Sequence, residues 1–126
     1  MSPQRSSHLW ASFGYAIAGL LEAYRTQRNV RIHLTASVLV SIAGLWLELQ
    51  LYEWAIIALT ISAVLTAEIV NTAAETLVDL ASPDYHPLAR RVKDLAAAGV
   101  LVRAIGAAIV GLLILGPPLL RKLGLG

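Results

Sequence analysis

The amino-acid sequence predicts an all-α integral membrane protein, with three transmembrane helices and an amphipathic surface helix at the N-terminus. The chain of 126 residues is 57% hydrophobic and only 14% charged, whereas soluble domains contain about 25% charged residues. Its apolar residues gather in long segments, and a membrane helix needs about 20 such residues to cross about 30 Å of hydrocarbon. A soluble helical bundle is the alternative, but it would leave too much apolar surface in water.

The elements follow in order along one domain, residues 1–126. We expect the surface helix at about residues 4–25 and the spans at about residues 29–48, 53–81 and 93–116. In the first element Leu9, Phe13 and Ile17 recur at helical spacing, and Trp10 suits the membrane interface. A cleaved signal peptide is the competing interpretation, because Leu9–Leu21 has the length of its apolar segment. We favour the surface helix because no clear small-residue cleavage site follows.

Basic residues predict the orientation. Arginines precede the first span, and a basic cluster lies in the connection that we expect from Ser82 to Asp94. The Glu48–Glu53 turn holds no basic residue. Since basic loops stay in the cytoplasm, we expect the N-terminus and the Ser82–Asp94 connection there, and the turn and the C-terminus outside. Arg121 and Lys122, after the last span, run against this rule.

Several classes of function are disfavoured. The net charge is only +2, and no basic patch with interleaved aromatic residues indicates a nucleic-acid partner. The absence of cysteine excludes disulfides, thiolate metal sites and cysteine nucleophiles. The sequence also contains no glycine-rich phosphate loop and no motif of the soluble kinases or zinc proteases.

A row of acidic and amide side chains marks the second span. Glu68, Asn71, Glu75 and Asp79 are spaced by three, four and four residues, which places them within an arc of about 80° on one helix face. Each charged side chain in a membrane helix costs about 2.5–3.5 kcal/mol on insertion scales, so the row should face protein or a ligand. A polar network that only pairs helices is the plain alternative, but three carboxylates on one face favour a functional site.

The depth of this row in the membrane reduces the number of candidate functions. Counted from Glu53 at the outer boundary, Glu68 lies about 22 Å and Glu75 about 33 Å along the helix, in a slab of about 30 Å. Chemistry on a lipid headgroup needs groups at this boundary, whereas a proton-coupled transporter places its carboxylate nearer the midplane. A small oligomeric transporter and a non-catalytic membrane assembly protein remain as alternatives.

The same residues resemble the signature of the prokaryotic diacylglycerol kinase family, which includes undecaprenol kinases. The pattern E-x-x-N-x-x-x-E-x-x-x-D runs from Glu68 to Asp79, and the match continues through Tyr85–Ala89 and Val92–Ala98. Arg28–His33 fits the entry of the family's first span and looks more like the undecaprenol kinase branch. The resemblance extends over about residues 12–115.

The resemblance implies that ATP phosphorylates a membrane lipid alcohol, with undecaprenol favoured over diacylglycerol. It implies Mg²⁺ as cofactor and a homotrimer in a bacterial-type inner (plasma) membrane, with the N-terminus of each subunit cytoplasmic. The active sites would lie at the cytoplasmic boundary and be shared between neighbouring subunits.

The resemblance also implies residue roles. Glu68 matches the general base and, with Asn71, the lipid-substrate site, and Glu75 matches a metal carboxylate. The residues expected at the nucleotide are Tyr15, Gln27, Glu75, Asp84, Tyr85, His86, Lys93 and Asp94. Gln27 stands where the family has a second metal carboxylate, and its amide oxygen can coordinate Mg²⁺ without adding charge. Arg103 stands where the family usually has a small residue, and it is expected to reach the cytoplasmic boundary or to pair with an acidic residue.

Overall fold

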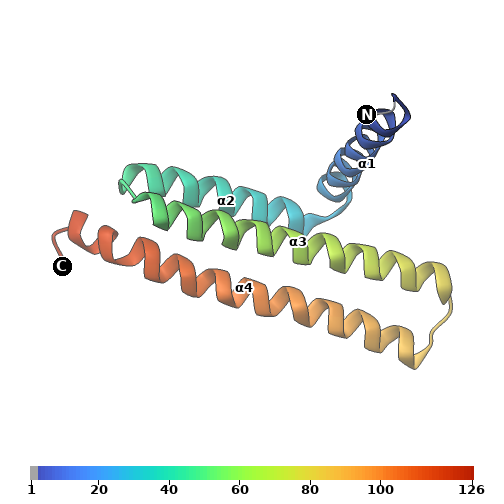
Figure 1. Cartoon of the computed structure of the whole chain (residues 1–126). Helices are drawn as coiled ribbons and strands as arrows, with labels where there is room; N and C mark the ends of the chain where they lie inside the picture. The colour runs from blue at the N-terminus through green and yellow to red at the C-terminus, as the bar shows by residue number, and fades with distance from the viewer. Residues whose placement is uncertain (1–2) are drawn as a thin grey trace.

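The computed structural model describes residues 3–126, with side chains from residue 8 onward. The described chain folds into four helices: α1 (Pro3–Thr26), α2 (Arg28–Trp46), α3 (Leu51–Ala81) and α4 (Pro87–Lys122). Helices α2, α3 and α4 run antiparallel to their neighbours along one bundle, and α1 leans away from it (Figure 1). Each of these three bundle helices is long and apolar enough to cross a membrane. The prediction of an all-α protein with three spans is therefore confirmed.

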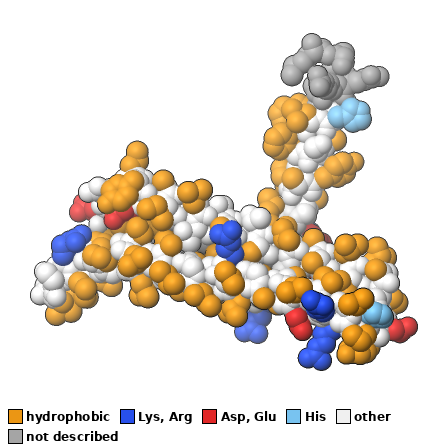
Figure 2. Space-filling model, turned by 60° about the horizontal axis from the view of Figure 1, so that its bottom comes forward, with side chains coloured by type: hydrophobic (Ala, Val, Ile, Leu, Met, Phe, Trp, Pro, Cys, Tyr) orange, Lys and Arg blue, Asp and Glu red, His pale blue; other side chains and the backbone are white. Residues whose placement is uncertain are grey.

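Most large apolar side chains lie on the outside of the single chain, and they cover much of the surface seen in Figure 2. Among the described residues, the buried apolar side chains are Ala23, Val30, Leu47, Ile57 and Val64. No residue is buried in the most apolar stretch of α4. Such a surface is stable only against lipid or against other subunits. The chain is therefore a multi-pass membrane protein.

The corner between α1 and α2 is held by a single arginine. Gln27 interrupts the helices with an extended backbone. Arg31, one turn into α2, donates from its guanidinium group to Tyr24 O at 2.9 Å and to Arg25 O at 3.0 Å. These carbonyls are among the last of α1 and lack partners within that helix. A cation at a helix C-terminus is also favourable for the helix dipole. Arg31 therefore fixes where α1 leaves the bundle.

The turn between α2 and α3 is tight and requires a glycine. Glu53 Oε2 accepts a hydrogen bond from the backbone N–H of Gln50 at 2.8 Å, which completes a capping box at the start of α3. Gly44 is buried near the end of α2. A Cβ atom on Gly44 would lie 2.7 Å from Cη2 of Trp54, so the missing side chain lets the indole pack against α2.

The non-helical connection between α3 and α4 is shorter than the Ser82–Asp94 connection predicted between the spans. The non-helical segment is residues 82–86, and α4 begins at Pro87. His86 is the N-cap residue, and its Nδ1 accepts the backbone N–H of Leu88 at 3.1 Å. Proline at the first helical position has no N–H to leave unpaired. Arg90, Arg91, Lys93 and Asp94 therefore lie on α4 and not in a loop.

The outer end of α4 also extends beyond the predicted span, through Pro117 and Pro118 to Lys122. Lys122 donates from Nζ to the carbonyl of Trp46, and its ammonium group lies 4.8 Å from the centroid of the Trp46 ring. Lys122 thus caps α2 and makes a cation–π contact. This contact gives Lys122 a structural role that does not depend on the orientation of the chain in the membrane.

Replacing Gly44 with alanine should destabilise the bundle. The new Cβ would force the Trp54 indole to move, and overpacking of this kind costs about 1–3 kcal/mol. Gly14→Ala is the control, because a Cβ on Gly14 meets no atom within 4 Å and alanine is the better helix former. Thermal unfolding in detergent should give a lower Tm for Gly44→Ala and an unchanged or raised Tm for Gly14→Ala. Equal Tm values would contradict the proposed packing of Trp54.

Candidate active site

The acidic row of α3 passes from the protein interior to the surface. Glu68 is only 2% exposed and is the most deeply buried ionisable side chain among the described residues. Asn71 and Glu75 are half-buried, and Asp79 is exposed near the end of the helix. Seven residues separate Glu68 from Glu75, which corresponds to about 10 Å along the axis. The row therefore offers a dry carboxylate at one end and wetter ones at the other.

Glu68 faces a histidine on α2. His33 Nε2 lies 3.2 Å from Glu68 Oε1, which is an ion-pair distance, although the contact is not aligned as a hydrogen bond. This pair was not predicted from the sequence. A signal was present, because His33 enters the first span at a depth similar to that of Glu68 in the second. Antiparallel neighbours place such residues at one level.

Asn71 and Glu75 form the next pair along the row. Asn71 Nδ2 donates to Glu75 Oε1 at 3.2 Å. This orients the amide so that Asn71 Oδ1, which is buried, makes no hydrogen bond to any described residue. Glu68 Oε1 is also buried and makes no hydrogen bond to any described residue. Two buried acceptors three residues apart lie on one face, and a donor such as a hydroxyl group or water is needed to satisfy them.

The C-terminal end of α3 and the N-terminal end of α4 are held together by an ion pair. Lys93 Nζ lies 2.6 Å from Asp79 Oδ1, whereas Arg90 and Asp94 pair loosely along α4 at 3.8 Å. A hollow of about 170 Å³ opens beside the Lys93–Asp79 pair. Its polar lining includes Asp79, Ser82, Asp84, Tyr85, His86, Arg90 and Lys93. Four of the residues predicted at the nucleotide therefore gather around one cavity.

Four residues predicted at the nucleotide do not line this cavity: Tyr15, Gln27, Glu75 and Asp94. Tyr15 is 78% exposed on α1, outside the bundle. Gln27 lies at the α1–α2 corner, where its side chain reaches only Thr26 Oγ1, at 3.5 Å. Among the described side chains, no three metal-binding groups of the His, Cys, Asp or Glu type converge. The half-buried Glu75 carboxylate still suits Mg²⁺, which commonly takes one or two carboxylates together with substrate phosphates and water.

Arg103 lies on the wall of a second hollow, of about 440 Å³, between α3 and α4. Asn71 lines the same hollow. None of the ion pairs formed by the described residues includes Arg103. The expected acidic partner of Arg103 is therefore not found within the part of the single chain that the structure describes.

These features define a class of protein: a small helical membrane protein with a row of carboxylates that ends at one boundary of the membrane. Comparison with known proteins supplies the family. The family model of prokaryotic diacylglycerol kinase matches residues 14–115. Our chain therefore belongs to the prokaryotic diacylglycerol kinase family of lipid kinases, as its motifs predicted.

Individual relatives carry two different activities in their names. The chain is 42% identical over 113 residues to the undecaprenol kinase of Bacillus subtilis (strain 168), covering 90% of our chain and 92% of that kinase. It is 47% identical over 118 residues to a diacylglycerol kinase of Synechocystis sp., covering 93% of our chain and 67% of that kinase. It is 30% identical over 102 residues to the diacylglycerol kinase of Escherichia coli (strain K12), covering 81% of our chain and 84% of that kinase.

Proposed function

We propose that this protein transfers the γ-phosphoryl group of ATP to the hydroxyl group of a membrane lipid alcohol, at the cytoplasmic boundary of a bacterial inner membrane. The observation that carries the proposal is the buried Glu68 carboxylate, which begins a polar row leading to the end of α3. A soluble substrate has no need of a base at this depth. A lipid hydroxyl lies just inside the boundary of the hydrocarbon and meets such a base directly.

At the lipid end, Glu68 acts as general base and Asn71 helps to hold the acceptor. The lipid hydroxyl donates its single O–H to Glu68 Oε1, and this proton passes to Glu68. Asn71 Oδ1, the second unpaired acceptor, is satisfied by water or by another hydroxyl group beside the reacting one. The freed oxygen forms a bond to the γ-phosphorus while the bond to the bridging oxygen of ADP breaks. Positioning and charge neutralisation supply most of the catalysis in phosphoryl transfer.

At the nucleotide end, Glu75 is the residue that would hold Mg²⁺, with Gln27 as a weak, neutral ligand. When bound, Mg²⁺ neutralises part of the phosphate charge. Lys93 bonds to Asp79 through one of its three ammonium protons, which leaves two for a phosphate oxygen. Three residues of the connection before α4 (Asp84, Tyr85 and His86) are proposed to contact the nucleotide. Asp94 would contact it from α4, and Tyr15 from α1.

Assembly into a homotrimer with shared active sites belongs to the same proposal. Tyr15 is exposed on α1, the side-chain amide of Gln27 donates to Thr26 Oγ1, and the apolar sides of α1 and α4 are uncovered. A neighbouring subunit would cover these apolar faces and bring its own Tyr15 and Gln27 to the site. The orientation that we propose has the N-terminus and the segment 82–86 in the cytoplasm.

Cysteine labelling tests this orientation, because the chain has no cysteine of its own. Pro83→Cys should react with an impermeant maleimide from the cytoplasmic side, and Gln50→Cys from the opposite side. Mass measurement of the purified protein in detergent should give three copies. Labelling of both positions from one side would refute the orientation, and a stable, active monomer would refute the shared site.

The acceptor is proposed to be a long polyprenol rather than diacylglycerol. This choice rests on the Arg28–His33 motif, since the relatives carry both names. Competition between undecaprenol and diacylglycerol in one vesicle should give the higher kcat/KM for undecaprenol, with modest activity on both because each offers one hydroxyl at similar depth. A kcat/KM clearly higher for diacylglycerol would reverse the assignment.

Separate substitutions of Glu68 and Glu75 test the mechanism. Glu68→Gln keeps the shape and removes the base, so kcat should fall by roughly 10²–10⁴-fold while ATP still binds. Glu75→Gln leaves no carboxylate at the metal, because Gln27 is already neutral. Mg-ATP binding should therefore weaken, and added Mg²⁺ should partly restore it. Calorimetry of nucleotide binding, beside measurement of kcat, separates the two effects.

Glu48→Gln is the matched control, since it removes a carboxylate from the exposed turn at the opposite end of the bundle. Its turnover and nucleotide affinity should match those of the unmodified protein. Loss of nucleotide binding in Glu68→Gln, with normal binding in Glu75→Gln, would mean that the roles are exchanged. Normal turnover in both variants would refute the kinase mechanism.

A further inference from the structure

Buried carboxylates that act as bases must release the proton they receive. If Glu68 is the base of the proposed kinase, each cycle leaves on it the proton of one lipid hydroxyl. The side chain of Glu68 is only 3% exposed, so it has almost no direct contact with water. A carboxyl group that stayed protonated could not accept the next proton. The site therefore needs a second group that takes this proton outward.

His33 is the ionisable side chain that contacts Glu68. Its Nε2 lies 3.2 Å from Glu68 Oε1, and no other ion pair of Glu68 occurs among the residues that the structure describes. On α3 itself, Glu75 lies about 10 Å further along the axis. On α4, Arg103 keeps its charge at any physiological pH and cannot accept a proton. His33 is thus the available acceptor.

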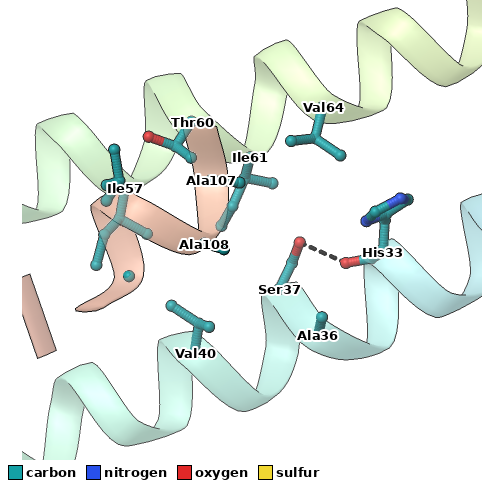
Figure 3. Close-up of a pocket in the computed structure, with 12 residues that line it drawn as sticks. His33, Ala36, Ser37, Val40, Ile57, Thr60, Ile61, Val64, Ala107 and Ala108 are labelled. Carbon is teal, nitrogen blue, oxygen red and sulfur yellow. Dashed lines mark hydrogen bonds between the residues drawn. The ribbon is translucent and has the colours of Figure 1, made fainter. Parts of the chain in front are cut away.

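The two side chains differ in their exposure within the single chain. The His33 side chain is 25% exposed, compared with 3% for Glu68. Figure 3 shows the imidazole at one end of a groove between α2, α3 and α4, with its ring directed toward α3. Its backbone carbonyl accepts a hydrogen bond from Ser37 Oγ at 2.7 Å. The groove is lined mostly by apolar side chains, but His33 lies only five positions from the start of α2, so the ring stands between a dry carboxylate and the end of the helix.

We propose that His33 is the proton exit of the site, taking the proton from Glu68 after each phosphoryl transfer and passing it to water. The inference rests on the proposed function. The lipid hydroxyl proton moves to a Glu68 oxygen as the new oxygen–phosphorus bond forms. It then moves to His33 Nε2, which returns Glu68 to its carboxylate form, and the imidazolium releases a proton to solvent. Imidazole suits this task because it changes charge near neutral pH.

A role limited to orienting Glu68 makes a different kinetic prediction. An orienting residue affects every turnover, including the first. A proton exit affects only the turnovers after the first, because no proton has been taken from a lipid hydroxyl before the first turnover. A diffusible base in the solvent replaces a missing exit, but it does not replace a missing orienting contact.

Rapid-quench kinetics of His33→Gln in vesicles, at low buffer concentration, separates these roles. The variant should form about one lipid phosphate per site at a rate close to that of the unmodified protein. Later turnovers should then be slower by at least about 10-fold. This loss should be smaller than the roughly 10²–10⁴-fold that general base catalysis contributes to the rate, because water replaces the histidine in part. Added imidazole should raise the later rate of His33→Gln in proportion to its concentration, with little effect on the unmodified protein.

His8→Gln is the control, since it removes an exposed imidazole on α1 and should leave both phases unchanged. Equal loss of the first and later turnovers in His33→Gln, without a response to imidazole, would show that His33 only orients Glu68. Unchanged kinetics would show that the proton leaves by another path. If His33→Gln does not fold, His33→Asn repeats the test with a shorter amide. Failure of the unmodified protein to phosphorylate any lipid would instead refute the proposed function.

Discussion

Charged groups in hydrocarbon are costly, and this cost organises the structure around Glu68. An ionised side chain within a membrane span must find protein, a ligand or water. Glu68 is almost completely buried and lies against His33 on the neighbouring helix. The contact couples α2 to α3 at the level where the polar row begins. The rest of the row becomes progressively more exposed toward the end of α3, so only its first member depends on a protein partner in this way.

The same cost explains why a single chain leaves apolar surface uncovered and polar groups without partners. Three helices cannot shield their apolar surface and their polar row at the same time, and most large apolar side chains of the described chain remain exposed. Lipid can cover the apolar faces, but it cannot satisfy Arg103 or the buried oxygens of Glu68 and Asn71. These groups need polar partners from outside the single chain. A substrate hydroxyl and neighbouring subunits are partners of the right chemistry.

The sequence predicts the helices and the row well, because both depend on periodicity within one segment. Contacts between segments are harder to predict, and His33 shows why: its partner lies 35 positions away (68 minus 33), and no local pattern joins them. The start of α4 was misplaced for a different reason. His86 and Pro87 form a helix start in which histidine replaces the usual capping residues. Lys122 was read as a topology signal, whereas its contact with Trp46 depends on how α4 packs.

The carboxylates of the row also differ in burial, and this difference suits them to different roles. A carboxylate near the surface exchanges protons and ions with water directly, so Glu75 and Asp79 need no dedicated protein partner to return to their charged form. Glu68 gains a different property from its dry position. Without competing water, a lipid hydroxyl beside Glu68 meets the carboxylate as its strongest acceptor, and water is less able to take the phosphoryl group in place of the lipid. The burial that favours the lipid over water also isolates Glu68 from the solvent. In the proposed mechanism, the selectivity of the base and its need for His33 therefore have one physical origin.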